Sequence, residues 1–266
     1  MPYENLRVDR PAPGVGRVTL ARPEKMNPMF RQTAIELQGA LDELGADESV
    51  VCVILASTGK AFVGGADLGV LASIPDVFGM REYITLLWET FRKVELLPQP
   101  VIAAVNGFAF GAGMELVSAC DFAIASDTAR FAMPEPDLGL PSVIQAALFP
   151  KYASLGRIRE WLYTADEIDA VEAERWGLVN RVVPLAELEA ESIKVASKIA
   201  AKGSLAIRLQ KELMATRWLR SDLETAMRDS VNFVALPFAT GEPQRRAQRI
   251  RDQIRARKSG PGGSQT

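Results

Sequence analysis

Two continuous apolar runs, each followed by a glycine-rich turn, place the strongest constraint on the fold of this chain. Residues 50–58 read VVCVILAST, and residues 99–107 read QPVIAAVNG. Runs of this length that are rich in β-branched residues are typical of strands buried on both faces of a parallel sheet. A segment of helical periodicity follows each run after its turn, and the alternating stretch 15–23 adds a further strand. The repeated order of strand, turn and helix therefore predicts an α/β domain.

The character of the chain changes after Pro150, where helical patterns become dominant. We expect a core domain over residues 1–200, a helical region over residues 201–258, and a disordered tail over residues 259–266, which read SGPGGSQT. Residues 241–258 predict a basic helix, which we interpret as a solvated face or an oligomer contact. A contribution to binding a phosphate-bearing cofactor is the alternative.

Composition and charge exclude several classes of protein. The 266 residues are 48% hydrophobic and 24% charged, as in an ordinary globular protein. A net charge of −2 gives no general reason to expect nucleic acid as a partner. The longest apolar stretch, residues 101–114, is shorter than the roughly 20 residues of a membrane-spanning helix, so we expect no membrane segment. Cys52 and Cys120 form no CxxC pair, which favours reduced thiols and a cytoplasmic location.

The chain contains no histidine. This absence excludes Ser-His-Asp and Cys-His catalysis, as well as HExxH zinc sites. With only two isolated cysteines, a zinc site is not expected either. If the protein is an enzyme, carboxylates, backbone amides, lysine, tyrosine or serine must carry its chemistry.

A lone carboxylate, Glu115, stands in the apolar stretch GFAFGAGMEL, residues 107–116. A buried and unpaired carboxylate is costly, so this position indicates either a partner or a function. Gly111, Ala112 and Gly113 lie just before it, between a predicted strand and a predicted helix, where backbone N–H groups are free at the positive end of the helix dipole. A tight turn packed on a neighbour is the alternative. A dinucleotide-binding fingerprint is disfavoured, because Leu116 stands where the third glycine would be.

A second turn of small residues, AFVGGADL, occupies residues 61–68 directly after a predicted buried strand. The N–H of Ala66 could point into the same space as the N–H of Ala112. Two convergent N–H groups form an oxyanion hole, and loss of one such donor costs roughly 2.7–4 kcal/mol of transition-state stabilisation. Asp67 is well placed to cap the helix that follows.

A third segment, FAMPEPDLGLP, holds Glu135 between Pro134 and Pro136. The two prolines restrict the backbone and hold this carboxylate in a fixed direction. We interpret the competing carboxylate, Asp137, as a turn or cap residue. Nothing in the spacing shows that Glu135 meets Glu115.

These three segments, with ARPEKMN (21–27) and AERWGLVNRVV (173–183), resemble the crotonase (enoyl-CoA hydratase/isomerase) family over residues 15–184. The resemblance implies an α/β spiral fold, the ClpP/crotonase fold, made of repeated ββα units. It also implies that the trailing helices pack into a homotrimer or a hexamer, a dimer of trimers. The substrate would be an acyl-CoA thioester, with its carbonyl oxygen between the backbone amides of Ala66 and Ala112. The resemblance implies no cofactor besides the coenzyme A of the substrate.

By the same resemblance, Glu115 and Glu135 correspond to the two glutamates that flank the reacting double bond in relatives that hydrate enoyl-CoA. Glu115 would activate water toward the β-carbon, and Glu135 would deliver a proton to the α-carbon. The presence of both glutamates favours hydration of an enoyl-CoA to a 3-hydroxyacyl-CoA. Isomerisation, hydrolysis or carbon–carbon cleavage of a CoA thioester is the alternative within the family. A non-catalytic acyl-CoA-binding subunit is the alternative from another class.

Substrate contacts are expected beside the two turns and along a wall formed by residues 68–97. Helical core packing explains the apolar candidates in this wall equally well. After Gly139 the chain departs from the glycine-rich continuation of well-studied hydratases, which leaves the acyl group open. The residues expected to contact substrate are Gly65, Asp67, Leu68, Met80, Trp88, Gly111, Gly113 and Met133, with Tyr83 and Leu87 as further candidates for the wall.

Overall fold

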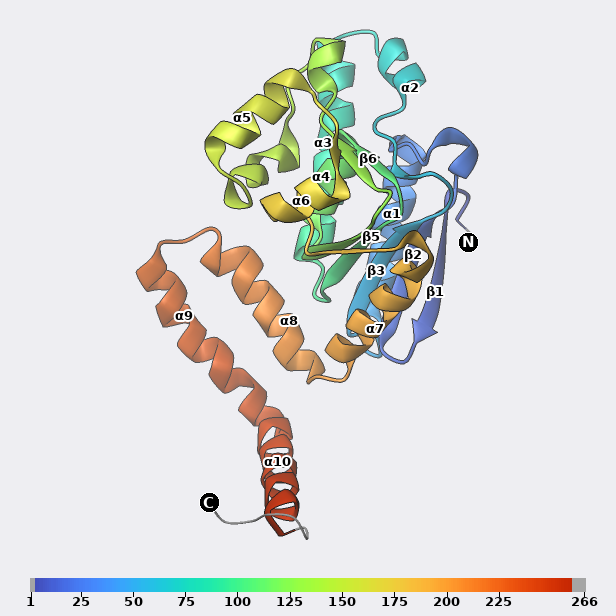
Figure 1. Cartoon of the computed structure of the whole chain (residues 1–266). Coiled ribbons are helices and arrows are strands. Elements are labelled where there is room, and N and C mark those ends of the chain that lie inside the picture. Colours follow the sequence, from blue (N-terminus) through green and yellow to red (C-terminus); the bar gives the residue numbers. More distant parts are fainter. Residues whose placement is uncertain (1–2, 260–266) are drawn as a thin grey trace. The chain divides into compact units, whose positions relative to one another are not determined.

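The computed structural model describes residues 3–259, and the chain divides into two compact units, Met1–Lys202 and Gly203–Thr266 (Figure 1). The first unit contains both β-sheets and the helices that cover them, and the second unit is helical. Within residues 3–259, no helix combines the length and the apolar character that crossing a membrane requires. The expected disordered tail, apart from Ser259 at the end of the last helix, lies outside the described residues.

The larger sheet has six strands in the order β1-β2-β3-β5-β7-β10. β1 pairs with β2 in antiparallel fashion, and the other neighbours are parallel. The two continuous apolar runs form β3 and β5, as predicted, and every residue of β5 is buried. The strands are β1 (Leu6–Ala12), β2 (Val15–Leu20), β3 (Cys52–Ser57), β5 (Val101–Val105), β7 (Phe122–Ser126) and β10 (Arg181–Val183).

The smaller sheet has four strands in the order β4-β6-β8-β9. β4, β6 and β8 run parallel, and β9 is antiparallel to β8. Gly107 allows the tight passage from β5 to β6, because a Cβ atom there would lie 2.0 Å from the backbone oxygen of Lys60. The strands are β4 (Ala61–Val63), β6 (Phe108–Phe110), β8 (Arg130–Ala132) and β9 (Ile168–Asp169).

The chain follows one path repeatedly: a strand enters the larger sheet, the next strand enters the smaller sheet, and a helical segment follows. Each repeat adds the neighbouring strand to both sheets, so the units wind into a spiral of ββα repeats. β3 and β4 lead into α2 (Leu68–Ser73) and α3 (Val77–Leu96), β5 and β6 lead into α4 (Ala112–Ala119), and β7 and β8 lead into a 3₁₀ turn (Glu135–Leu138).

Helices cover both faces of the larger sheet. α1 (Arg31–Ala46) packs against α3 in one apolar cluster, and α7 (Leu188–Ala200) lies along β2 and β3 in a second cluster (Figure 1). Alternate residues of β3 point into the two clusters, because successive side chains of a strand face opposite sides. Cys52 and Cys120 are both buried, and neither forms a disulfide.

Two further helices, α5 (Leu155–Thr164) and α6 (Ala170–Trp176), complete the first unit. The ring of Trp161 holds them together, with its centroid 5.4 Å from that of Phe149 and 5.6 Å from that of Trp176. Short 3₁₀ segments span Pro23–Lys25, Ile144–Lys151 and Leu185–Glu187.

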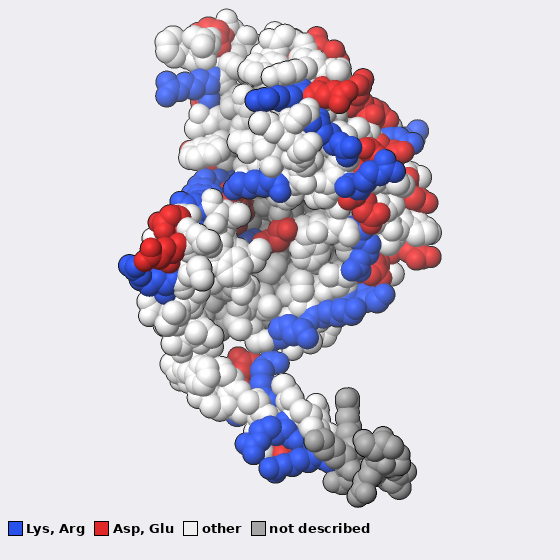
Figure 2. Space-filling model, turned by 60° about the vertical axis from the view of Figure 1, so that its left-hand side comes forward, with Lys and Arg blue, Asp and Glu red and all other residues white. Residues whose placement is uncertain are grey.

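The second unit ends in α10, which corresponds to the predicted basic helix. Arg246 pairs with Glu242 one turn away at 2.8 Å, a pairing typical of a solvated helix face. Figure 2 shows Lys and Arg side chains gathered along the chain just before the grey residues. The elements of this unit are α8 (Ser204–Glu212), a π-helical turn (Leu213–Trp218), α9 (Leu223–Ala235), a 3₁₀ turn (Leu236–Thr240) and α10 (Glu242–Ser259).

Candidate active site

Three neighbouring parallel strands bring the three predicted segments together. In the smaller sheet, Val63 of β4 lies opposite Ala109 of β6, and Phe110 of β6 lies opposite Ala132 of β8. Because parallel strands end at the same edge of a sheet, the residues that follow them gather at that edge. The backbone N–H of Gly111 also donates to the oxygen of Ala132 at 2.9 Å, which fastens the second segment to the third.

A cavity of about 470 Å³ opens at this edge. It is lined mainly by apolar side chains, and both glutamates predicted from the sequence border it. A pocket of this kind, apolar with a few convergent polar groups, is typical of a small-molecule site. The residues from the first two segments and from α3 that line it include Gly65, Ala66, Leu68, Met80, Tyr83, Leu87, Gly111, Ala112 and Glu115, and Glu135 lines it from the third segment.

Glu115 lies in the first turn of α4 and is only 4% exposed. Its Oε1 atom has no hydrogen-bond partner among the described residues. Burial, and then the negative charge of Glu135, raise its pKa from 4.5 to about 8, and a hydrogen bond from the backbone of Ala146 opposes this rise. The carboxyl therefore holds its proton at neutral pH in the free protein.

Glu135 begins the 3₁₀ turn between Pro134 and Pro136. Burial raises the pKa of this carboxyl, while a hydrogen bond from the Ser142 hydroxyl to Oε2, at 3.1 Å, counteracts part of the rise. Oε1 of Glu135 lies against Gly111, where an added Cβ atom would be 2.5 Å from it, and both carboxyls border one cavity, so the two interact. Since they interact, their titration belongs to the pair.

The raised pKa of Glu115 predicts that the folded state loses stability as the pH rises. Between pH 4.5 and about 8 the folded protein binds a proton that the unfolded chain has released, so the free energy of unfolding falls across this window. In Glu115→Gln, the loss of stability between pH 5 and pH 8.5 should be smaller than in the wild type by on the order of 2–4 kcal/mol. Urea unfolding at a series of pH values measures this difference. Glu89→Gln, an exposed control on α3, should keep the wild-type slope, and an unchanged slope in Glu115→Gln would contradict the assignment.

Ala66 and Ala112 both line the cavity, and among the described residues no hydrogen-bond acceptor is bound to the backbone N–H of either. Ala112 is the first residue of α4, where an N–H has no partner within the helix. Gly65 and Gly111 precede the two residues with φ of +119° and +50°, a region that favours glycine. A Cβ atom at Gly65 would lie 3.5 Å from the backbone oxygen of Phe110, so the two turns are neighbours. Two free amides on one cavity are what the predicted oxyanion hole requires.

Two of the expected substrate contacts, Asp67 and Gly113, have structural tasks. The carboxylate of Asp67 caps α2 by accepting from the N–H groups of Gly69, at 2.8 Å, and Val70, at 3.1 Å. Gly113 faces away from the cavity, because a Cβ atom there would lie 2.2 Å from the backbone oxygen of Val63. Neither residue lines the cavity.

Two further candidates also lie outside the cavity lining. Met133 is fully buried in the core cluster. Trp88 is 47% exposed and lines a separate groove with Leu41 and Leu96. Trp88 does not line the cavity because only one face of α3 borders it, and position 88 lies on another face of the helix. The lining residues that the sequence analysis did not name as substrate contacts are Gly64, Leu71, Ile84, Pro134, Asp137, Leu138, Leu140, Pro141 and Val143.

A family model described as enoyl-CoA hydratase/isomerase matches residues 11–245. The chain belongs to this family. It is 38% identical over 242 residues to the crotonyl-CoA hydratase of Syntrophomonas wolfei, covering 90% of this chain and 92% of the relative. It is 38% identical over 215 residues to the short-chain-enoyl-CoA hydratase of Clostridium acetobutylicum, covering 80% of this chain and 82% of the relative.

Solved structures of the enoyl-CoA hydratase/isomerase family confirm the predicted fold. The enoyl-CoA hydratase of Bacillus anthracis superposes with a TM-score of 0.90 at 34% identity, covering 94% of this chain and 97% of that one. A structure from Geobacillus kaustophilus, titled as an enoyl-CoA hydratase subunit, superposes with a TM-score of 0.87 at 30% identity, covering 99% of this chain and all of that one. The crotonase spiral is therefore the architecture of this chain.

The segment that departs from the glycine-rich pattern of the family borders the candidate site. Leu140, Pro141 and Val143 line the cavity, and the Ile144–Lys151 segment behind them packs against α4. The sequence signal for these lining residues was the run of apolar side chains after Gly139. Whether those side chains point into the cavity depends on how the segment packs against α4.

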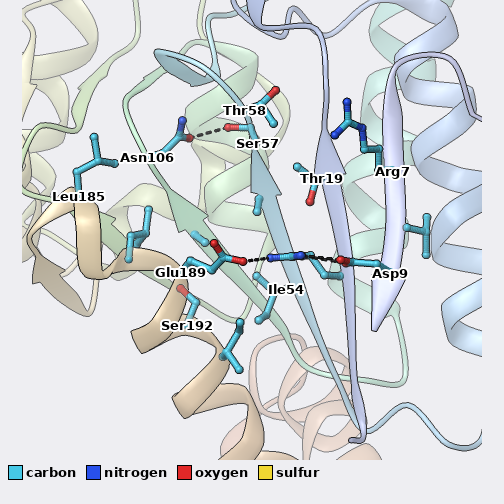
Figure 3. Close-up of a pocket in the computed structure, with 16 residues that line it drawn as sticks. Arg7, Asp9, Thr19, Ile54, Ser57, Thr58, Asn106, Leu185, Glu189 and Ser192 are labelled. Atoms are coloured by element: carbon cyan, nitrogen blue, oxygen red, sulfur yellow. Dashed lines mark hydrogen bonds and ion pairs between the residues drawn. The ribbon is translucent and has the colours of Figure 1, made fainter. Parts of the chain in front are cut away.

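A second cavity, of about 570 Å³, lies between the larger sheet and α7 and does not contain the glutamate pair (Figure 3). Both carboxylates of its lining pair with Arg17: Asp9 at 2.6 Å and Glu189 at 2.5 Å. The Ser57 hydroxyl donates to Oδ1 of Asn106 at 2.6 Å. With its carboxylates committed to Arg17, this cavity offers no acid–base pair for the chemistry of the family.

Proposed function

We propose that this protein is an enoyl-CoA hydratase, which adds water across the 2,3-double bond of an enoyl-CoA thioester to give a 3-hydroxyacyl-CoA. One observation carries the proposal: two buried glutamates border a single apolar cavity beside two backbone amides without acceptors. The names of the curated relatives support it, since they include a crotonyl-CoA hydratase and a short-chain-enoyl-CoA hydratase.

In the proposed mechanism, the thioester carbonyl oxygen accepts hydrogen bonds from the N–H groups of Ala66 and Ala112. These donors stabilise the enolate-like charge that develops when water adds to the β-carbon. In the reacting state the proton shared by the pair lies on Glu135, and Glu115 is ionised. Glu115 then takes a proton from the attacking water, and Glu135 gives its proton to the α-carbon. One proton is taken from water and one is given to carbon, so the pair keeps one proton between its two carboxyls and exchanges it internally or with solvent.

Water addition requires proton transfer and charge stabilisation, but no change of oxidation state. The chain supplies both through its carboxyls and amides, so the proposed reaction uses no cofactor besides the coenzyme A of the substrate. The two buried free thiols are in keeping with a reducing compartment, and we place the protein in the cytoplasm.

Crotonyl-CoA is the first substrate to test, because of the curated relatives, followed by longer, branched and aryl-substituted enoyl-CoAs. The expected result is a loss of the enoyl-thioester absorbance with 3-hydroxyacyl-CoA as the product by mass spectrometry. Binding of the thioesters without turnover would instead support a non-catalytic acyl-CoA-binding subunit. Either that outcome or a different product removes the hydratase proposal.

A second candidate is isomerisation of the double bond. The structure titled as a monofunctional enoyl-CoA isomerase from Mycobacterium smegmatis superposes with a TM-score of 0.73 at 34% identity, covering 84% of this chain and 98% of that one. An isomerase would return a product of unchanged mass with a moved double bond, whereas hydration adds the mass of one water. Product mass therefore separates the two candidates.

We also propose that the second unit assembles three copies of the chain into a homotrimer, alone or as a dimer of trimers. On α9, Leu223, Met227, Val231 and Val234 form one stripe at helical spacing, and each is 64–76% exposed in the single chain. An exposed apolar stripe of this kind is typical of a protein–protein interface. A second copy is the natural partner, because the family resemblance implies trimers.

Val231→Glu should shift the protein from trimer toward monomer, because a charge in an apolar interface is costly to desolvate. Analytical ultracentrifugation measures the shift. Arg228→Ala, on the same helix but at an exposed position paired with Glu224, should keep the assembly. A monomeric wild type, or a Val231→Glu variant that remains fully trimeric, would contradict the proposed interface.

A further inference from the structure

The two oxygens of Glu135 have different surroundings. Oε2 accepts a hydrogen bond from the Ser142 hydroxyl at 3.1 Å. Oε1 lies against the Gly111 turn, where a Cβ atom at Gly111 would be only 2.5 Å from it. Oε2 is therefore held by Ser142, and Oε1 faces the turn that carries the Ala112 amide.

We propose that Ser142 is a positioning residue, which anchors Oε2 of Glu135 so that Oε1 is the oxygen that exchanges a proton with the substrate. This inference rests on the proposed function. It concerns the segment after Gly139, where this chain departs from the glycine-rich pattern of well-studied hydratases.

A hydroxyl suits this task because it both donates and accepts hydrogen bonds. It donates to Oε2 when Glu135 is ionised, and it accepts from Oε2 when that oxygen carries the proton. The carboxyl keeps its orientation through both halves of a proton-transfer cycle. Glycine or alanine at position 142 has no side-chain group that can do so.

The other polar groups around Glu135 are engaged differently. Glu115 of α4 borders the same cavity, and its carboxyl repels that of Glu135 when both are ionised. Asp137 of the same turn also lines the cavity, and Tyr83 of α3 donates its hydroxyl to the backbone oxygen of Met29 at 2.6 Å. Among the described residues, Ser142 is the side chain that hydrogen-bonds Glu135. Its hydrogen bond lowers the pKa of Glu135 against the effect of burial, so its removal raises that pKa.

The test compares Ser142→Ala with Ser142→Thr in the full-length protein, with crotonyl-CoA as substrate. A hydrogen bond to a charged group predicts that Ser142→Ala lowers kcat about tenfold or more, leaves KM within about twofold, and shifts the pH profile of kcat/KM to higher pH. Ser142→Thr keeps the hydroxyl and should restore both the rate and the profile. Ser73→Ala, which removes an exposed hydroxyl bonded to the backbone of α2, should behave as the wild type.

A second measurement separates this inference from the proposed function. Carbon-13 NMR titration of labelled glutamate carboxyls, without substrate and with Glu135→Gln to assign the signal, should show a higher pKa for Glu135 in Ser142→Ala than in the wild type. A wild type that does not hydrate enoyl-CoA removes the proposed function, and the titration still decides whether Ser142 holds Glu135. An unchanged titration in Ser142→Ala overturns the inference. So does a Ser142→Thr variant that is as slow as Ser142→Ala while all variants melt as the wild type does.

Discussion

Glu115→Gln and Glu135→Gln should each lower kcat for hydration of crotonyl-CoA by about 10²–10⁴-fold, the range for loss of a general acid or base. Glutamine keeps the size of the side chain but neither takes a proton from water nor gives one to carbon. Both variants should still bind the thioester, because the cavity and the amides of Ala66 and Ala112 are unchanged. Absorbance of the enoyl thioester measures the rate, and calorimetric titration measures binding.

Such a loss of activity in Glu115→Gln would not come from unfolding. Burial of an ionised Glu115 lowers the stability of the wild type at high pH, and glutamine at this position removes that effect. Glu89→Gln on the exposed face of α3 should retain full activity. Hydration at the wild-type rate in either glutamate variant would remove that residue from the proposed mechanism.

Gly113→Ala should lower the free energy of unfolding by about 2–3 kcal/mol, the upper part of the range for overpacking a well-packed interior. The added methyl group would lie 2.2 Å from the backbone oxygen of Val63 and 3.0 Å from its Cβ atom, so α4 must move away from β4. Chemical unfolding followed by circular dichroism measures the loss. Because Ala112 and Glu115 lie on the same helix, activity should also fall.

Gly156→Ala is the matched control. Gly156 lies in α5, nothing lies within 4 Å of an added Cβ atom, and alanine is the better helix former there. This variant should be as stable as the wild type or slightly more so. Equal stability of the two variants would show that the close approach of Gly113 to β4 is not a constraint.

Much of the fold was predictable from local patterns. The apolar runs of β3 and β5, the turns at Gly65 and Gly111, and the cap at Asp67 each depend on residues within a few positions. Period-two and helical patterns report local burial, and glycine reports local backbone geometry. The sequence predicted less well which way a side chain points. Trp88 and Met133 are both apolar and stand in the expected segments, yet neither lines the cavity.

The sequence by itself determined which groups are available: no histidine, two glutamates in apolar surroundings, and two turns of small residues ahead of helices. Tertiary structure decided which of them meet. Glu115 and Glu135 share a cavity because β6 pairs with β8 in a register that sets Phe110 opposite Ala132. Ser142 reaches Oε2 of Glu135, and Gly113 faces Val63, through the same kind of non-local packing. Strand register and helix docking are set by the summed burial of many side chains, so no short stretch of sequence carries this information.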